Sequence, residues 1–271
     1  MAEGFSVIIV TDLEGAACVV SPVVWDREDA TGGFREASEI LAGEINAAAG
    51  AAFAAGADEV AVVEGHSGSF RGLIDRFDPR AKISQGVPFY ELAEQGWDAL
   101  CLVGYHAMAD AERAVLSHSF ADRAYVSSWL NGTLVGEIGH LAALFGEHGT
   151  PLVFVSGDMA AAREAEELVE GVVTAAVKEA AHRFGGISFS PQAAREMIAE
   201  SAGEAFAARE EIVPLRVEPP VEFVVEFSTT DPVERNVLVP GIETAGPRRM
   251  VIRGETVTEV MRLFELTGRI V

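Results

Sequence analysis

The chain has 271 residues, 49% of them hydrophobic and 23% charged, so it can bury a substantial core as one large domain or two small ones. Its 20 basic against 42 acidic residues give a formal net charge of -22, which repels phosphate backbones and argues against a nucleic-acid partner. With two cysteines, an acidic opening without a basic leader and no run of roughly 18 apolar residues, we expect a cytoplasmic protein without a disulfide framework or membrane contact.

The first hundred residues predict alternating strands and helices. Three short apolar runs are typical of strands buried on both faces: the β-branched 6–11 (SVIIVT), 59–64 (EVAVVE) and 99–103 (ALCLV). An alanine-rich helix is predicted from about residue 35 to 55, with Gly56 as its C-terminal stop, and a second helix at 88–95. This order and spacing indicate a parallel α/β sheet.

A hairpin interrupts this alternation in the middle of the chain. Asn131-Gly132 lies between the β-rich segments 124–130 and 134–135, and this dipeptide is a strong hairpin signal. We therefore expect antiparallel strands near 118–136.

Further elements are predicted after the hairpin. Residues 152–155 (LVFV) indicate a strand, and Asp158 then caps a long helix, rich in alanine and glutamate, that runs to about Arg183. Ser190-Pro191 opens another helix, with serine as the cap and proline at the first position.

The last sixty or so residues have a different pattern of strand and turn signals from the preceding segments. Residues 221–227 (VEFVVEF) alternate polar and apolar side chains as a half-buried strand does, and Asp231-Pro232 and Pro240-Gly241 mark turns. The predicted fold class is α/β, with a three-layer α/β/α core around a mainly parallel sheet and a smaller α+β portion. We assign residues 1–190 to the α/β domain, with the hairpin near 118–136 as an insertion, and 191–271 to the α+β portion.

Potential metal ligands follow three of the predicted strands, where open α/β sheets bind their ligands. Asp12 and Glu14 follow the first strand and project to the same side in an extended backbone; His66 follows the second and His106 the third. Each residue alone is more often a cap, a loop residue or a structural histidine. Together, two carboxylates and two imidazoles at one sheet edge suit Zn²⁺ or a related divalent ion. Glu137, after the hairpin, is a further carboxylate, although spacing alone does not recruit it.

The stretch G-H-S-G-S at residues 65–69 allows a competing interpretation, in which Ser67 is the nucleophile of a serine hydrolase. Position 69 is serine where the G-x-S-x-G turn requires glycine, and no convincing order of acid and histidine partners is visible. We therefore favour His66 as a ligand and Ser67 as a support of its loop. His140, three residues after Glu137, could share a helix face with it, but a structural role is favoured.

Five motifs occur in a fixed order: Asp12-Leu13-Glu14-Gly15, Gly65-His66-Ser67, Gly104-Tyr105-His106, Ser117-His118-Ser119, and Asn131-Gly132 with Val135-Gly136-Glu137. In order and approximate spacing they resemble the DppA-type D-aminopeptidases, the M55 family of zinc metallopeptidases. The similarity continues through residues 156–158, 165–168 and 174–178 and is looser over the rest of the chain.

The resemblance implies a site with two Zn²⁺ per subunit. The family's metal ligands fall on Asp12, which would bridge the ions, on Glu14 and His66 at one ion, and on His106 and Glu137 at the other. The histidine of the chemical step falls on His118, which would transfer a proton, stabilise an oxyanion or attack directly. Family members resemble one another in forming homodecamers of stacked five-membered rings.

The implied function is release of N-terminal D-amino acids, notably D-alanine, from short peptides by metal-activated water. Two alternatives remain: a metal-dependent amidohydrolase for another small amide, and a non-catalytic peptide-binding protein. Two departures bear on the choice. The family often has aspartate two residues before the first histidine ligand, where this chain has Glu64, followed by Gly65. If that acid orients His66, the longer Glu64 must reach it differently. The loop over residues 16–24 also differs, which leaves the substrate less determined than the metal.

Overall fold

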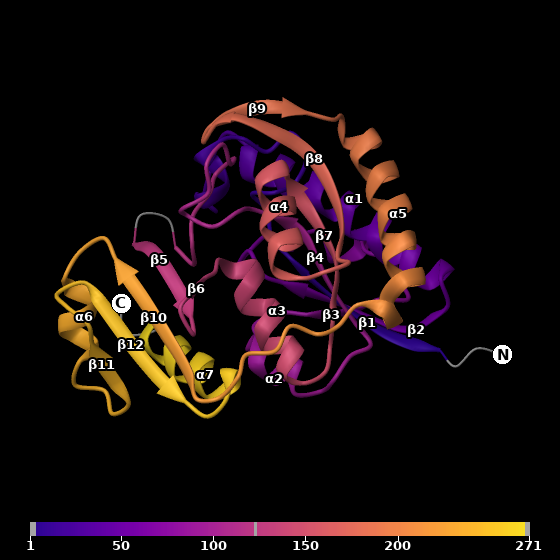
Figure 1. Cartoon of the computed structure of the whole chain (residues 1–271). Helices are drawn as coiled ribbons and strands as arrows, with labels where there is room; N and C mark the ends of the chain where they lie inside the picture. The colour runs from indigo at the N-terminus through magenta and orange to yellow at the C-terminus, as the bar shows by residue number, and fades with distance from the viewer. Residues whose placement is uncertain (1–3, 122–123, 269–271) are drawn as a thin grey trace.

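The computed structural model describes residues 4–121 and 124–268 and places two sheets side by side (Figure 1). The larger sheet has the strand order β3-β2-β1-β4-β7-β8-β9, and every neighbouring pair in it is parallel except β8 with the edge strand β9. Its strands are β1 Phe5–Thr11, β2 Ala57–Glu64, β3 Lys82–Ser84, β4 Ala99–Tyr105, β7 Leu152–Asp158, β8 Val173–His182 and β9 Gly185–Ser188.

Helices cover both faces of this sheet. On one face α1 (Gly33–Ala54) packs against α5 (Pro191–Ala208), and on the other lie α3 (Glu137–Glu147) and α4 (Met159–Leu168), with the short α2 (Phe89–Ala93) beside α3 (Figure 1). Short 3-10 turns lie at Pro22–Trp25 (η1), Ile74–Arg76 (η2) and Arg209–Glu211 (η3). The core strands β1 and β4 are almost wholly buried, as expected for strands covered on both faces.

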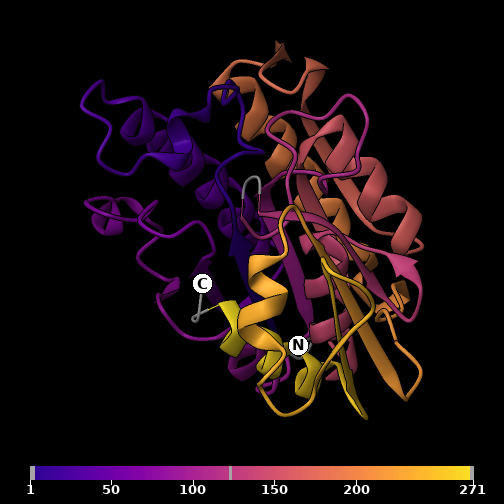
Figure 2. The same ribbon diagram turned by 90° about the vertical axis from the view of Figure 1, so that its left-hand side faces the viewer.

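The second sheet is antiparallel, with the order β11-β12-β10-β5-β6. Its strands are β5 Tyr125–Leu130, β6 Thr133–Leu134, β10 Val221–Phe227, β11 Ile242–Thr244 and β12 Arg249–Gly254. The short α6 (Asp231–Asn236) follows β10, and α7 (Val257–Gly268) packs against β10, β12 and α3. Figure 2 views the molecule from the side of this sheet, with α6 toward the viewer.

The predicted α/β class, with a mainly parallel sheet, helices on both faces and an added α+β portion, is confirmed. The hairpin is confirmed as β5–β6, where Asn131 and Gly132 take the positive φ values of 45° and 79° that such turns require. Ser190 and Pro191 open α5 as predicted. The domain division at residue 190 remains a prediction, although the hairpin pairs with β10 from beyond that point.

Two predicted elements are wrong. The helix expected from Asp158 to Arg183 ends at Leu168; Asp158 does cap it, but a turn at Gly171, with φ of 83°, leads into strand β8. Parallel pairing of this segment with β7 outweighs the helix propensity of its alanines. Asp231-Pro232, expected as a turn, begins α6, because proline fits the first position of a helix.

The register of the central strands determines where the site lies. Thr11, the last residue of β1, pairs with Glu64 at the end of β2 and with Val103 near the end of β4. Residues that follow these strands therefore leave the sheet at one edge. Gly104 permits close approach there: its φ is 76°, and a Cβ on it would lie 2.3 Å from the carbonyl oxygen of Asp12. Among the described residues, no helix is both long and apolar enough to cross a membrane.

Candidate metal centre

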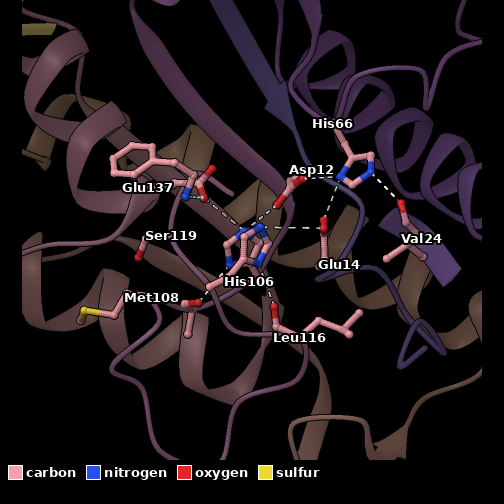
Figure 3. Close-up of polar contacts among 12 residues, drawn as sticks. Asp12, Glu14, Val24, His66, His106, Met108, Leu116, Ser119 and Glu137 are labelled. Carbon is pink, nitrogen blue, oxygen red and sulfur yellow. Dashed lines mark hydrogen bonds and ion pairs between the residues drawn. The ribbon is translucent and has the colours of Figure 1, made fainter. Parts of the chain in front are cut away.

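Asp12 lies between two histidines at this edge of the sheet (Figure 3). Its Oδ1 is 3.3 Å from Nδ1 of His66, and its Oδ2 is 3.2 Å from Nε2 of His106. Glu14 Oε2 lies 3.0 Å from the same nitrogen of His66, and Glu137 Oε1 lies 3.5 Å from the same nitrogen of His106. The five candidate ligands thus form two groups of donor atoms that share the Asp12 carboxylate.

Backbone carbonyls hold both imidazoles in orientation. His66 Nε2 lies 2.9 Å from the carbonyl oxygen of Val24, and His106 Nδ1 lies 2.9 Å from that of Ala107, so these nitrogens are the ones that donate. In the neutral rings, the remaining nitrogens then present lone pairs to carboxylate oxygens. Two facing acceptors need a proton or a cation between them. In addition, Asp12 Oδ2 is buried without a hydrogen-bond partner. The donor set and this orphaned oxygen fit a divalent cation.

The electrostatics of the pocket agree with this fit. Burial alone would lower the pKa of His66, but Glu14 and Asp12 together raise it to about 10. Burial likewise opposes the charged form of His106, but Asp12 and Glu137 hold its pKa well above the usual value. Burial would raise the pKa of Asp12, and its two histidine partners instead lower it well below the usual range. The negative charge of the site thus favours a positive charge at each histidine, which a proton or a metal ion would supply.

His118 stacks on His106, with ring centroids 3.8 Å apart and 19° between the planes. Its Nδ1 lies 2.9 Å from the carbonyl oxygen of Leu116, while its Nε2 lies 4.0 Å from Glu14 Oε1 and faces the carboxylates. Donor atoms of His106, His118 and Glu137 lie within 4.8 Å of one another, as do those of Asp12, Glu14 and His106. Geometry therefore brings His118 to the site together with the five candidate ligands.

Glu14 has supports that the sequence did not predict. Trp25, at the end of η1, donates its indole N–H to Glu14 Oε1 at 2.6 Å, and its ring meets His118 edge-on with centroids 5.7 Å apart. The buried Lys178 of β8 donates to the carbonyl oxygens of Glu14, Ala16 and Val19. The loop that follows β1 is therefore held from both sides. A lysine in an alternating apolar strand was the available signal, but that segment was predicted as a helix.

Glu64, the acid considered above as a possible support of His66, has other partners. It accepts from the backbone N–H of Phe70 at 2.8 Å and from Gln85 at 3.0 Å. The carbonyl oxygen of Val24 instead holds Nε2 of His66. Ser67 is exposed on the loop beside His66. Glu137 accepts from the backbone N–H of Phe120 at 2.6 Å, a further contact that the sequence did not reveal.

His140 lies one helical turn from Glu137 and is buried in an aromatic surround. The rings of Phe120 and Phe223 meet it edge-on at 4.9 and 4.7 Å, and its Nε2 lies 3.2 Å from Ser128 Oγ. Burial lowers the pKa of His140 to about 3, against a small opposing effect of Glu137, so the ring is neutral at physiological pH. It lines a cavity of about 370 Å³ that also borders Asp12 and Glu137.

Comparisons with known proteins agree on one family. The sequence model of the D-aminopeptidases of peptidase family M55 matches residues 5–266. The D-aminopeptidase of Bacillus subtilis (strain 168) is 32% identical over 210 residues, which span 75% of this chain and 75% of that protein. A solved structure described as the Zn-dependent D-aminopeptidase DppA from Bacillus subtilis, a self-compartmentalizing protease, matches with a TM-score of 0.90 at 24% identity, over 98% of this chain and 97% of that one. That structural likeness shows a shared fold.

Proposed function

Since this chain belongs to the M55 peptidase family of D-aminopeptidases, we propose that it is a dinuclear zinc enzyme that releases N-terminal D-amino acids from short peptides. Family membership makes it a peptidase, as the sequence predicted, and leaves the alternative of a non-catalytic binding protein without support. Peptides with N-terminal D-alanine serve as the reference substrates in the experiments proposed below. The proposal rests on one observation above all: two groups of carboxylate and imidazole donors meet at one sheet edge and share Asp12.

The proposed ligand sets follow from these distances. Glu14 and His66 would hold one ion and His106 and Glu137 the other, with one oxygen of Asp12 turned toward each. Zinc held by these residues would lower the pKa of a bound water to about 7 and would polarise the scissile carbonyl. The chain's part is to fix the ligands, and the carbonyls of Val24 and Ala107 do so by orienting the two imidazoles.

His118 is the proposed proton carrier. Its Nδ1–H is directed at the Leu116 carbonyl, which leaves Nε2 unprotonated in the neutral ring and turned toward the centre. Stacking on His106 and the edge contact with Trp25 restrict its rotation. In this orientation Nε2 can accept a proton and return it to the leaving amine, or donate to the developing oxyanion once protonated.

Metal analysis followed by assays on matched dipeptides tests the proposal. Purified protein should contain two zinc ions per chain and should hydrolyse D-Ala-Gly much faster than L-Ala-Gly. Bound zinc without turnover of any peptide would favour an amidohydrolase acting on another amide. Preference for the L-peptide would contradict the assigned stereochemistry.

We further propose a cytoplasmic homodecamer. The description of the similar Bacillus subtilis structure as a self-compartmentalizing protease supports assembly, but it applies to that protein. Light scattering coupled to gel filtration would give the mass of the assembly directly: ten times the 28.7 kDa chain is expected, and a monomer would contradict the proposal.

A further inference from the structure

The cavity beside the metal centre has apolar walls that the proposed chemistry does not use. The cavity has a volume of about 370 Å³, and Asp12 and Glu137 border its metal end. Part of the wall comes from segments that carry no candidate ligand, and part comes from α3, which begins at Glu137. The wall includes Phe89 of α2, Phe120, Leu144 of α3, and Met261 and Phe264 of α7.

Aromatic rings pack together in and behind the wall, and its described residues are largely uncharged. Phe120, Phe223 and Phe264 make edge contacts with one another, and Phe120 and Phe223 also contact His140. Among the described residues that line the cavity, Glu265 is the only acid besides the two candidate ligands. Apolar walls with a few polar groups at one end are typical of a site for a small organic group rather than for a further ion.

We propose that this cavity receives the side chain of the substrate's N-terminal residue, and that the enzyme prefers D-residues with large aliphatic or aromatic side chains to D-alanine. The inference rests on the proposed function and deepens it. The Cβ of the N-terminal residue is two bonds from the scissile carbonyl carbon, whereas that of the next residue is three bonds away. A cavity that begins at the metal ligands is therefore reached more directly by the first side chain.

The cavity has room for a large side chain, and the burial energy of that side chain sets the size of the preference. A methyl group occupies about the space of one water molecule, roughly 30 Å³, and leaves most of the 370 Å³ unfilled. Each additional buried methylene raises kcat/KM roughly fourfold, so the three extra carbons of leucine give about fiftyfold.

The first test needs only the unaltered enzyme loaded with zinc. We expect kcat/KM for D-Leu-Gly and D-Phe-Gly to exceed that for D-Ala-Gly by about ten- to fiftyfold. Equal or lower values would overturn the cavity assignment, as would a preference for D-Lys-Gly or a gain seen only when the large residue stands second, as in D-Ala-D-Leu. Failure to cleave any of these peptides would instead overturn the proposed function itself.

A pair of variants on one helix locates the effect. Met261→Trp should fill part of the cavity and reduce the ratio of kcat/KM for D-Leu-Gly over D-Ala-Gly by at least about tenfold. Leu266→Trp, the matched control, adds the same indole on α7 at a side chain that is 54% exposed and outside the cavity, and should leave the ratio unchanged. Circular dichroism and zinc content establish that each variant is folded. An unchanged ratio in folded Met261→Trp would refute the assignment, and should that variant not fold, the wild-type peptide series decides alone.

Discussion

Replacing Trp25 by phenylalanine should weaken zinc binding through Glu14. The indole N–H donates to Glu14 Oε1 at 2.6 Å, and the Glu14 side chain is only 1% exposed, so water does not readily replace the lost donor. A hydrogen bond to a charged group is worth about 2 kcal/mol, which corresponds to roughly a thirtyfold loss of affinity. This magnitude agrees with the ten- to hundredfold cost usually found for residues that orient metal ligands. Phenylalanine keeps most of the ring that packs against His118.

Chelator competition measures this change in zinc affinity directly. The matched control is Trp129→Phe, a partly buried tryptophan of β5 whose ring lies under Arg249 and outside the candidate site. Trp25→Phe should bind the zinc ion assigned to Glu14 and His66 about thirtyfold less tightly, whereas Trp129→Phe should match the wild type. Equal affinities for the two variants would refute the idea that the indole supports Glu14.

Four other results are expected. His118→Ala should keep two zinc ions but lose most of kcat; loss of metal in this variant would identify His118 as a ligand. Lys178→Met leaves three buried carbonyl oxygens without their donor, so the free energy of unfolding should fall by about 3 kcal/mol and calorimetry should record a Tm lower by about 6–12 °C; an unchanged Tm would contradict this role. Chelation should abolish hydrolysis and zinc should restore it, and activity that survives complete removal of metal would contradict the mechanism. The folded-state pKa of His66, about 10, lies above the ordinary 6.5, so in zinc-free protein its stabilisation should be fully present below pH 6.5 and lost as the pH rises toward 10. The Tm of zinc-loaded protein should lack this decline, and a zinc-free Tm that stays level over the same range would count against it.

The ends of the central strands could be predicted from the sequence because they depend on local patterns. Short apolar runs gave β1, β2 and β4, and parallel strands bring Asp12, His66 and His106 to one edge whatever lies between them. Glu137 is different. It follows the hairpin and begins α3, and its distance to His106 depends on how that helix packs, which spacing along the chain does not reveal.

The supports of the site could not be predicted, because they join distant parts of the chain. Lys178 lies 164 residues from Glu14, and its segment was predicted as a helix from its alanine content, so its position in a buried strand was hidden. Helix α7, which walls the cavity, follows the second sheet, and nothing in its own pattern indicates that it lies near the candidate ligands. Local propensity determines elements, whereas these contacts depend on packing.

Zinc stoichiometry in single-ligand variants tests the shared role of Asp12 most directly. Elemental analysis of the wild type should find two zinc ions per chain. Glu14→Ala and Glu137→Ala should each retain one ion, because each removes a ligand from only one group of donors. Asp12→Ala should retain neither ion, since one oxygen of its carboxylate faces each histidine. If folded Asp12→Ala protein still carried two zinc ions, a centre bridged by this residue would be ruled out.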